Sequence, residues 1–97
     1  MGDTNRIVSM DPDVHQKIVS IVAEVLQIEI GDCNDNLLRK DRNEWDSVNH
    51  LRLAIELEEI FGILLDQERW VDIMTIREIE ILISEALKES EKTANSE

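Results

Sequence analysis

The sequence has no tyrosine, one phenylalanine and two tryptophans, so it offers few aromatic side chains on which the bases of single-stranded nucleic acid could stack. Positive charge is also scarce, because 10 lysine and arginine residues stand against 22 aspartate and glutamate residues and give a net charge of -12. A chain this acidic repels nucleic-acid phosphates and anionic lipid surfaces. The composition therefore argues against nucleic-acid binding and favours partners with basic surface patches.

Cysteine is almost absent as well, since Cys33 is the only one in the chain. A single thiol excludes an internal disulfide and any metal site built from several thiolates, and it fits a reducing compartment. No uninterrupted apolar run approaches the roughly 18 residues of a membrane span, and residues 1–10 lack the apolar core of a signal peptide. We therefore expect a cytoplasmic protein that does not associate with membranes.

Signals for β-structure are missing too. The chain contains one proline and three glycines, and neither Asn-Gly nor Asp-Gly, the common pairs in two-residue hairpin turns, occurs. Apolar residues instead recur at steps of three and four, which is the spacing of a buried helix face. With 97 residues the chain is long enough for one modest core and too short for two, so we expect a single all-α domain.

A first helix is predicted over residues 11–28. Asp11 is suited to the N-cap position and Pro12 to the first helical position, where a missing N–H costs nothing. The apolar residues of this segment form one stripe about three to four turns long. They are Val14, Ile18, Ile21, Val22, Val25 and Ile28.

Residues 29–45 lose this periodicity and are rich in aspartate, asparagine and charge. Leu37 and Leu38 form their only apolar pair, so we predict a long loop pinned to the core by one leucine. Long connections without secondary structure are uncommon in compact domains and are often functional. This draws attention to the point where the loop ends.

A second helix is predicted to begin at Asp46-Ser47 and to stop at Gly62, a residue suited to helix C-termini. It has more apolar positions than one stripe can hold. One face is expected to contact the core: Leu53, Leu57, Ile60 and Phe61. A neighbouring face that starts beside Ser47 carries a second set, which we call the outer stripe: Val48, Leu51 and Ile55.

Two further helices follow. The segment DQERWVDI is long enough for one or two turns, with Asp66 as its cap and with Trp70 and Ile73 pointing inward. The last helix begins with Thr75 and Glu78 at the spacing of a capping box. Its apolar residues then continue the helical spacing: Ile76, Ile79, Leu82, Ile83, Ala86 and Leu87.

These elements together predict an all-α four-helix bundle with three longer helices, one short third helix and a long first loop. We expect a flexible N-terminal segment over residues 1–10, a folded helical domain over residues 11–88 and a disordered polar tail over residues 89–97. The protein is expected to be a monomer.

A calcium site is considered first among the possible functional sites. Asp32, Asn34 and Asn36 have the alternating oxygen ligands of the first half of an EF-hand loop. However, Leu37 stands where the loop needs glycine, and Asn43 stands where it needs a bidentate glutamate. We therefore interpret this stretch as a polar loop.

A hydrolytic site is considered next, because Asp46, Ser47 and His50 are the residue types of a catalytic triad. All three fall within one helical turn at the predicted surface, and the G-x-S-x-G pattern of a nucleophile elbow is missing. The other histidine, His15, lies on a different helix, so His50 also lacks a metal-binding companion. We predict no catalytic residue and no metal site, and we expect His50 to face solvent or to make a contact.

Ser47 itself has two possible roles that remain open at this point. It can share the N-cap position with Asp46. It can also be the acceptor of a group that another enzyme transfers, since such a serine needs exposure, a helix terminus and a nearby docking surface but no base of its own. A phosphate joined to Ser47 would lie at the positive end of the helix dipole.

The stretch WDSVNHLRLAIELEEIFGILL resembles the acyl carrier protein family. The family's pattern is Asp-Ser followed by an aliphatic residue, a helix with an acidic pair before Phe, and an aliphatic-rich exit. The resemblance continues through DQERWVDIMTIREIEILI, where a short helix and a Thr-initiated last helix fall at the family's spacing, and it covers roughly residues 12–88. Ser47 stands in the modified position.

The resemblance implies that Ser47 is esterified with 4'-phosphopantetheine, which a separate phosphopantetheinyl transferase takes from coenzyme A. Acyl intermediates would then be bound as thioesters to the thiol of this arm. The protein would be a carrier and not an enzyme. Its further partners would be acyl-loading and acyl-processing enzymes with basic docking patches. Asp46 would be the recognition residue beside the modified serine, and docking is assigned to the outer stripe together with Glu56 and Glu59.

The sequence departs from the family's common pattern in three respects. The glycine that commonly lies shortly before Asp-Ser is absent, and Trp45 directly precedes Asp46, which argues against peptidyl carriers and the housekeeping fatty-acid carrier. Asn49 and Arg52 stand where many members have acidic residues. We therefore expect a specialised pathway, such as polyketide, modified-lipid or cell-envelope polysaccharide synthesis. The alternative is a carrier-like helical scaffold that is not modified at Ser47.

Overall fold

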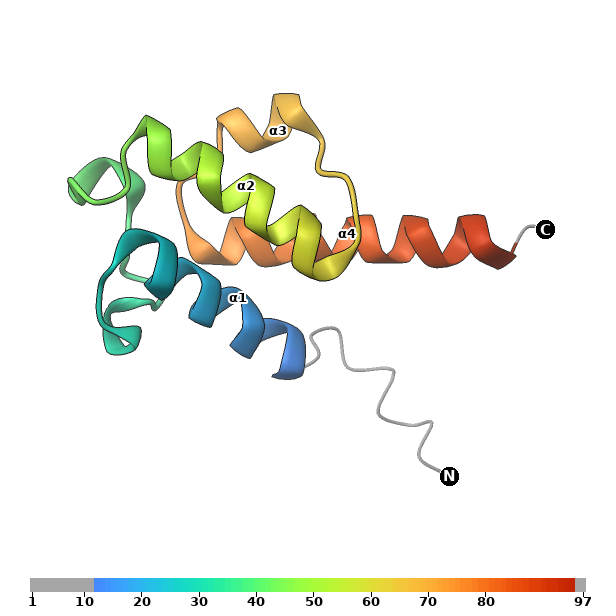
Figure 1. The fold of residues 1–97 in the computed structure, drawn as a ribbon, viewed down its shortest axis with the longest axis horizontal. Coiled ribbons are helices and arrows are strands. Elements are labelled where there is room, and N and C mark those ends of the chain that lie inside the picture. Colours follow the sequence, from blue (N-terminus) through green and yellow to red (C-terminus); the bar gives the residue numbers. More distant parts are fainter. Residues whose placement is uncertain (1–11, 96–97) are drawn as a thin grey trace.

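The computed structural model describes residues 12–95, with side chains described from residue 13 to residue 89. Within this range the chain forms helices but no β-strand, which confirms the predicted all-α class with four α-helices. The elements in chain order are α1 (Pro12–Leu26), η2 (Ile30–Asp32), η3 (Arg39–Asp41), α2 (Ser47–Phe61), α3 (Gln67–Val71) and α4 (Ile76–Asn95). In Figure 1, α1 and α3 lie on either side of α2, and α4 extends beyond the other helices.

The three long helices supply the centre of the core, with α1 packed against both α2 and α4. Among the described side chains, six apolar ones have no exposed surface, and each long helix contributes two of them: Ile18, Val22, Leu53, Leu57, Ile79 and Ile83. Burying an aliphatic side chain of this size contributes about 1.5–3 kcal/mol. This layer is therefore a main source of the stability of the bundle.

The predicted helix ends are confirmed at three places. Gly62 adopts the left-handed conformation with φ 65°, and its N–H donates to the carbonyl of Glu58 at the end of α2. The carboxylate of Asp66 accepts hydrogen bonds from the N–H groups of Glu68 and Arg69 in the first turn of α3. Thr75 and Glu78 form the predicted capping box, with distances of 3.1 Å from the Glu78 N–H to Thr75 Oγ1 and 3.3 Å from the Thr75 N–H to Glu78 Oε1.

α1 begins at Pro12, the position at which the sequence predicts the first helical residue. Asp11, the predicted cap, and the predicted flexible segment 1–10 lie outside the described residues. The helix ends without a glycine, because Gln27 takes the left-handed conformation at φ 58° and the Ile28 N–H reaches back to the Ala23 carbonyl.

α4 runs to Asn95, past residue 88, where the sequence predicts the end of the folded domain. Residues 89–95, which the sequence assigns to a polar tail, thus belong to this helix, while residues 96–97 lie outside the described range. The physical reason is local, since this stretch contains neither glycine nor proline, and its glutamate, lysine and alanine residues have high helix propensity.

The buried face of α2 is rotated relative to the predicted one. Leu53 and Leu57 are buried as predicted, but the face also includes His50. Ile60 is 49% exposed and Phe61 is only half-buried, so the prediction of Ile60 as a core residue is wrong. The buried face also includes Ala54. With about 3.6 residues per turn, this wider face is centred near His50 and leaves Ile60 at its edge.

Residues 29–45 are more structured than the predicted loop, because they contain η2 and η3. Leu37 is buried as predicted, but Cys33 and Trp45 are buried too, at 7% and 2% exposure, so the segment is held by more than one side chain. Burial, and after it the charge of Asp32, raises the pKa of the Cys33 thiol, while Arg42 acts in the opposite sense. A buried thiol with a raised pKa is a poor nucleophile.

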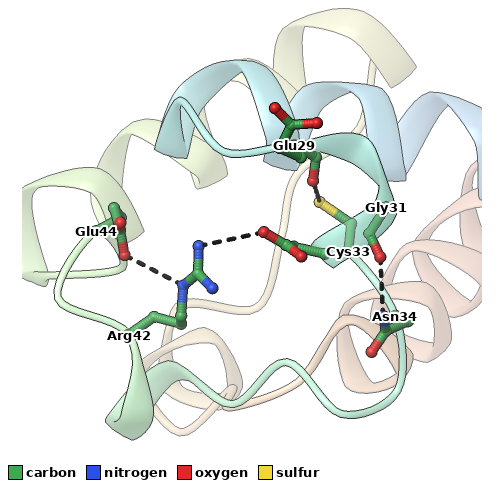
Figure 2. A network of polar contacts seen from close by, with 7 residues as sticks. Glu29, Gly31, Cys33, Asn34, Arg42 and Glu44 are labelled. Carbon is green, nitrogen blue, oxygen red and sulfur yellow. Dashed lines mark hydrogen bonds and ion pairs between the residues drawn. The ribbon is translucent and has the colours of Figure 1, made fainter.

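Polar contacts hold the same segment at its surface. Figure 2 shows Arg42 with its guanidinium directed at carboxylates on both sides. The Arg42 nitrogens lie 3.7 Å from Asp32 and 3.2 Å from Glu44. The backbone N–H of Arg39 donates to the Met74 carbonyl at 2.9 Å, which joins η3 to the connection between α3 and α4. The segment thus reaches Trp45 in a defined conformation.

Candidate functional site: the start of α2

The serine that the sequence singles out is the first residue of α2. Asp46 is the N-cap, because its Oδ1 accepts the backbone N–H of Asn49 at 2.9 Å and its carbonyl accepts the N–H of His50 at 2.8 Å. Ser47 is exposed. The capping hydrogen bond therefore comes from Asp46, and Ser47 lies at the surface where another molecule can reach it.

A second contact ties the turn before Ser47 to the helix after it. The side chain of Asn49 donates from Nδ2 to the carbonyl of Glu44 at 2.8 Å. Glu44 in turn accepts from Nε of Arg42 at 3.2 Å, as Figure 2 shows. Asn49 thus closes the turn around Ser47.

On the buried side of this turn lies a group that we call the indole–imidazole cluster: Trp45, His50 and Trp70. All three residues are buried, with exposures of 2%, 8% and 5%. The His50 and Trp70 rings stack at a centroid distance of 4.5 Å and an interplanar angle of 12°, and the Trp45 ring lies 6.1 Å from that of His50. The cluster joins the turn before Ser47, α2 and α3.

Hydrogen bonds define the protonation state of the imidazole in this cluster. Nε1 of Trp45 lies 3.0 Å from Nδ1 of His50, and Nε2 of His50 lies 2.7 Å from the carbonyl oxygen of Trp70. An indole N–H only donates and a carbonyl only accepts, so Nδ1 must accept and Nε2 must carry the proton. The contacts therefore favour neutral His50 in the Nε2–H form.

The burial of His50 rules out the first of its two expected positions, facing solvent, and agrees with the second, in which it makes a contact. It lies on the core face of α2, where the two indoles cover it. Burial lowers the pKa of His50 below its ordinary value of 6.5; the hydrogen bond to the Trp70 carbonyl acts in the opposite sense, and the positive charge of Arg39 lowers it further. His50 thus has a structural position on the core face of α2, and its two tryptophan partners lie outside that helix.

The outer stripe lies at the surface. Val48, Leu51 and Ile55 are 64%, 60% and 51% exposed, although each is a large aliphatic residue. Glu56 and Glu59, the acidic residues assigned to docking, are exposed as well. α2 therefore presents apolar and acidic side chains to solvent along the helix that begins at Ser47. An exposed aliphatic group of this kind is typical of an interaction surface.

The arrangement does not support a hydrolytic triad. The Asp46 carboxylate caps the backbone at Asn49, and both ring nitrogens of His50 are engaged with tryptophans, so neither group is directed toward activating Ser47. Among the described residues, no group of three or more His, Cys, Asp or Glu side chains is placed to hold a metal ion. In the stretch resembling a calcium loop, Asn34 Oδ1 accepts the Asn36 N–H at 2.8 Å, which is a turn contact.

Two acidic residues have structural contacts that the sequence does not indicate. Glu58 accepts the backbone N–H of Leu65 at 2.9 Å and so fixes the connection that follows α2. Glu80 is only 8% exposed and contacts His15 of α1 through Nδ1. Both residues belong to acidic stretches whose composition is typical of solvent-exposed helix faces. Only the three-dimensional structure identifies their partners.

A surface groove of about 1070 Å³ lies at the far end of α2 from Ser47. The α2–α3 connection and α4 line it, with Leu64, Arg69 and Glu85 among the lining residues. Ser47 and its neighbours do not contribute to it. The groove is therefore separate from the candidate site.

Neither a protein-family model nor a curated protein matches this chain. Within residues 12–95, no helix is both long and apolar enough to cross a membrane. The interpretation of the Ser47 region thus depends on its own residues and on their geometry.

Proposed function

We propose that this protein is an acyl carrier protein in which Ser47 bears 4'-phosphopantetheine. The observation that carries the proposal is an exposed serine at the first position of a capped helix whose outer face is apolar and acidic. The all-α fold with four helices is the one that the family resemblance requires. The proposed protein is a carrier and not an enzyme.

The proposed modification needs little chemistry from the chain itself. The Ser47 oxygen would attack the phosphorus that bears pantetheine in coenzyme A, the pyrophosphate bond would break, and adenosine 3',5'-bisphosphate would leave. The transferase supplies the base that takes the hydroxyl proton. The chain presents the hydroxyl on a rigid helix end, and the helix dipole there favours the phosphodiester anion that forms. Coenzyme A dependence and the single cysteine favour a cytoplasmic protein.

The outer stripe and the acidic residues beside it explain how partners would recognise the carrier. Glu56 and Glu59 would meet basic side chains on the transferase and on acyl-processing enzymes, and Leu51 and Ile55 would enter apolar depressions between them. Charge complementarity mainly speeds and orients such encounters, while apolar contacts supply much of the affinity. We assign the carrier to a specialised pathway, because Trp45, Asn49 and Arg52 depart from the family's common pattern.

Intact-mass spectrometry tests the proposal. The purified chain is incubated with coenzyme A and each of several promiscuous phosphopantetheinyl transferases, beside Ser47→Ala and Ser20→Ala. Ser20 is an exposed serine within α1 and is the matched control. We expect one phosphopantetheinyl group on the wild type and on Ser20→Ala, and none on Ser47→Ala. If the wild type gains no mass with any transferase, the unmodified scaffold becomes the better account.

A further inference from the structure

The indole–imidazole cluster carries hydrogen bonds in both directions between α2 and α3. Nε2–H of His50 donates to the Trp70 carbonyl at 2.7 Å, and the Trp70 indole donates back to the His50 carbonyl at 3.1 Å. The two rings are stacked, so the same pair of residues also makes the apolar contact. A reciprocal pair of this kind fixes both the distance and the relative orientation of the two helices.

The position of α3 depends on tertiary contacts of this kind. α3 has five residues, well below the ~12–15 residues that an isolated helix needs in water. Trp70 is the residue that this helix buries. The contact between Trp70 and His50 is therefore a principal link between α3 and α2.

Trp45 connects the same imidazole to the serine. Its indole donates to Nδ1 of His50, and only Asp46 separates it from Ser47 along the chain. Asp46 caps α2, so a movement of the Trp45 ring would shift the backbone that sets the direction of the Ser47 side chain. One imidazole thus bonds to the turn that presents Ser47 and to the helix across from it.

We propose that His50 is a positioning residue for Ser47, which as a neutral Nε2–H imidazole holds the Trp45–Asp46–Ser47 turn in a fixed place relative to α3. This rests on the proposed function, because the consequence of positioning is that a transferase meets a preformed surface made of both helices. Preorganisation of this kind lowers the cost of ordering the surface on binding.

The positioning requires that His50 remain neutral. A proton on Nδ1 would place two N–H donors against each other at Trp45 and would break that contact. The groups that contact His50 from the Trp45 turn and from α3 are neutral indoles and a carbonyl, and the charged group that acts on it is Arg39 of η3. Acidification therefore weakens the contact by which His50 positions the Trp45–Asp46–Ser47 turn.

The tautomer is measured first, without any assay of function. Two-dimensional 1H–15N spectra of the full chain at about pH 7.5 show whether Nδ1 or Nε2 of His50 bears the proton. We expect the Nε2–H form, with both tryptophan indole N–H signals shifted in His50 variants and unshifted in His15→Asn, the control on α1. An Nδ1–H form or an imidazolium at that pH would overturn the proposal.

Two near-isosteric variants separate the two contacts. In His50→Asn the amide oxygen can replace Nδ1 as acceptor for Trp45, and in His50→Gln the amide nitrogen can replace Nε2 as donor to the Trp70 carbonyl. With a promiscuous transferase, we expect His50→Gln to raise the KM for the carrier about fivefold while kcat changes by less than about twofold. His50→Asn should raise KM less, and the control His15→Asn should not change it.

Equal KM values for the wild type and both His50 variants would contradict the proposal, because the wild type would then be modified without any help from His50. Failure of the proposed function looks different, since the wild type itself would gain no mass. If the His50 variants do not fold, Trp45→Phe removes the indole donor and keeps an aromatic ring, and the same rise in KM is expected. An unchanged KM in that variant would reject the positioning role.

Discussion

The inner and outer faces of α2 carry similar side chains but have opposite environments. Leu53 and Leu57 on the inner face have no exposed surface, whereas Leu51 and Ile55 on the outer face are 60% and 51% exposed. Apolar area stabilises the fold only where it leaves water. The comparison therefore separates residues that hold the bundle together from residues that the fold does not need, and the second group begins beside Ser47.

The largest expected effect is a loss of folding stability when a leucine on the inner face is replaced by alanine, compared with the same replacement on the outer face. Leu57→Ala should lower the free energy of unfolding by about 3 kcal/mol, because it opens a cavity in a packed core. Leu51→Ala, on the opposite face of the same helix, should change it by less than about 0.5 kcal/mol. Urea denaturation followed by circular dichroism gives both values. Similar losses in the two variants would show that the faces are misassigned.

The next expected effect is a pH dependence of folding stability that comes from His50, a polar residue on the inner face of α2. Its pKa is lowered in the folded state, so the unfolded chain binds its proton first as the pH falls below 6.5. Folding stability linked to His50 is thus complete above that pH and is lost as the pH falls toward the folded-state pKa. The stability advantage of the wild type over His50→Asn should shrink between about pH 7.5 and about pH 5.5.

Denaturation curves at each pH measure that difference directly. All other residues are common to both proteins, so the comparison isolates the contribution of position 50. A difference in unfolding free energy that stays constant over this pH range would mean that His50 does not titrate differently in the folded and unfolded states.

A smaller effect is expected at the helix start. Asp46→Ala should lower the free energy of unfolding by about 1 kcal/mol, because the backbone N–H of Asn49 loses its capping acceptor. Asp46→Asn keeps an acceptor and should lose much less. The same urea titrations compare the two variants. A loss in Asp46→Asn as large as that in Asp46→Ala would indicate that charge, and not capping, stabilises this end of α2.

The smallest effect on stability is expected on the outer face. Leu51→Glu and Ile55→Glu should each change the free energy of unfolding by no more than about 0.5 kcal/mol. Both should nevertheless slow the transfer of phosphopantetheine to Ser47, because a charge enters the apolar docking surface. Ile81→Glu adds the same charge at a 43% exposed site on α4 and should leave the transfer rate unchanged. If phosphopantetheine is transferred to all three variants at the same rate, the outer stripe does not take part in recognition by the transferase.

Much of the fold can be predicted from local signals in the sequence. The boundaries of α2 follow from Asp46 and Gly62, and the start of α4 follows from the capping box of Thr75 and Glu78. These signals depend on residues three or four apart, so a single sequence reveals them. The exposure of Ser47 follows in the same way from its place at a helix start.

Long-range contacts could not be predicted in this way. The sequence predicts that Trp70 points inward, but its partner His50 is 20 residues away. Nothing in the spacing indicates that the imidazole would bond to the Trp45 indole and to the Trp70 carbonyl. Cys33 also lies in a stretch without periodicity, and its burial depends on the path of the segment around it. The length of α4 could not be predicted for a different reason, because a stretch of polar helix-forming residues resembles a disordered tail in composition.

The most direct test of the central claim is site-resolved mass spectrometry of the chain after incubation with coenzyme A and a phosphopantetheinyl transferase. The account predicts one phosphopantetheinyl group per chain, located by fragmentation on the peptide that contains Ser47. A chain that stays unmodified with every transferase, or that carries the group on a different residue, would contradict it.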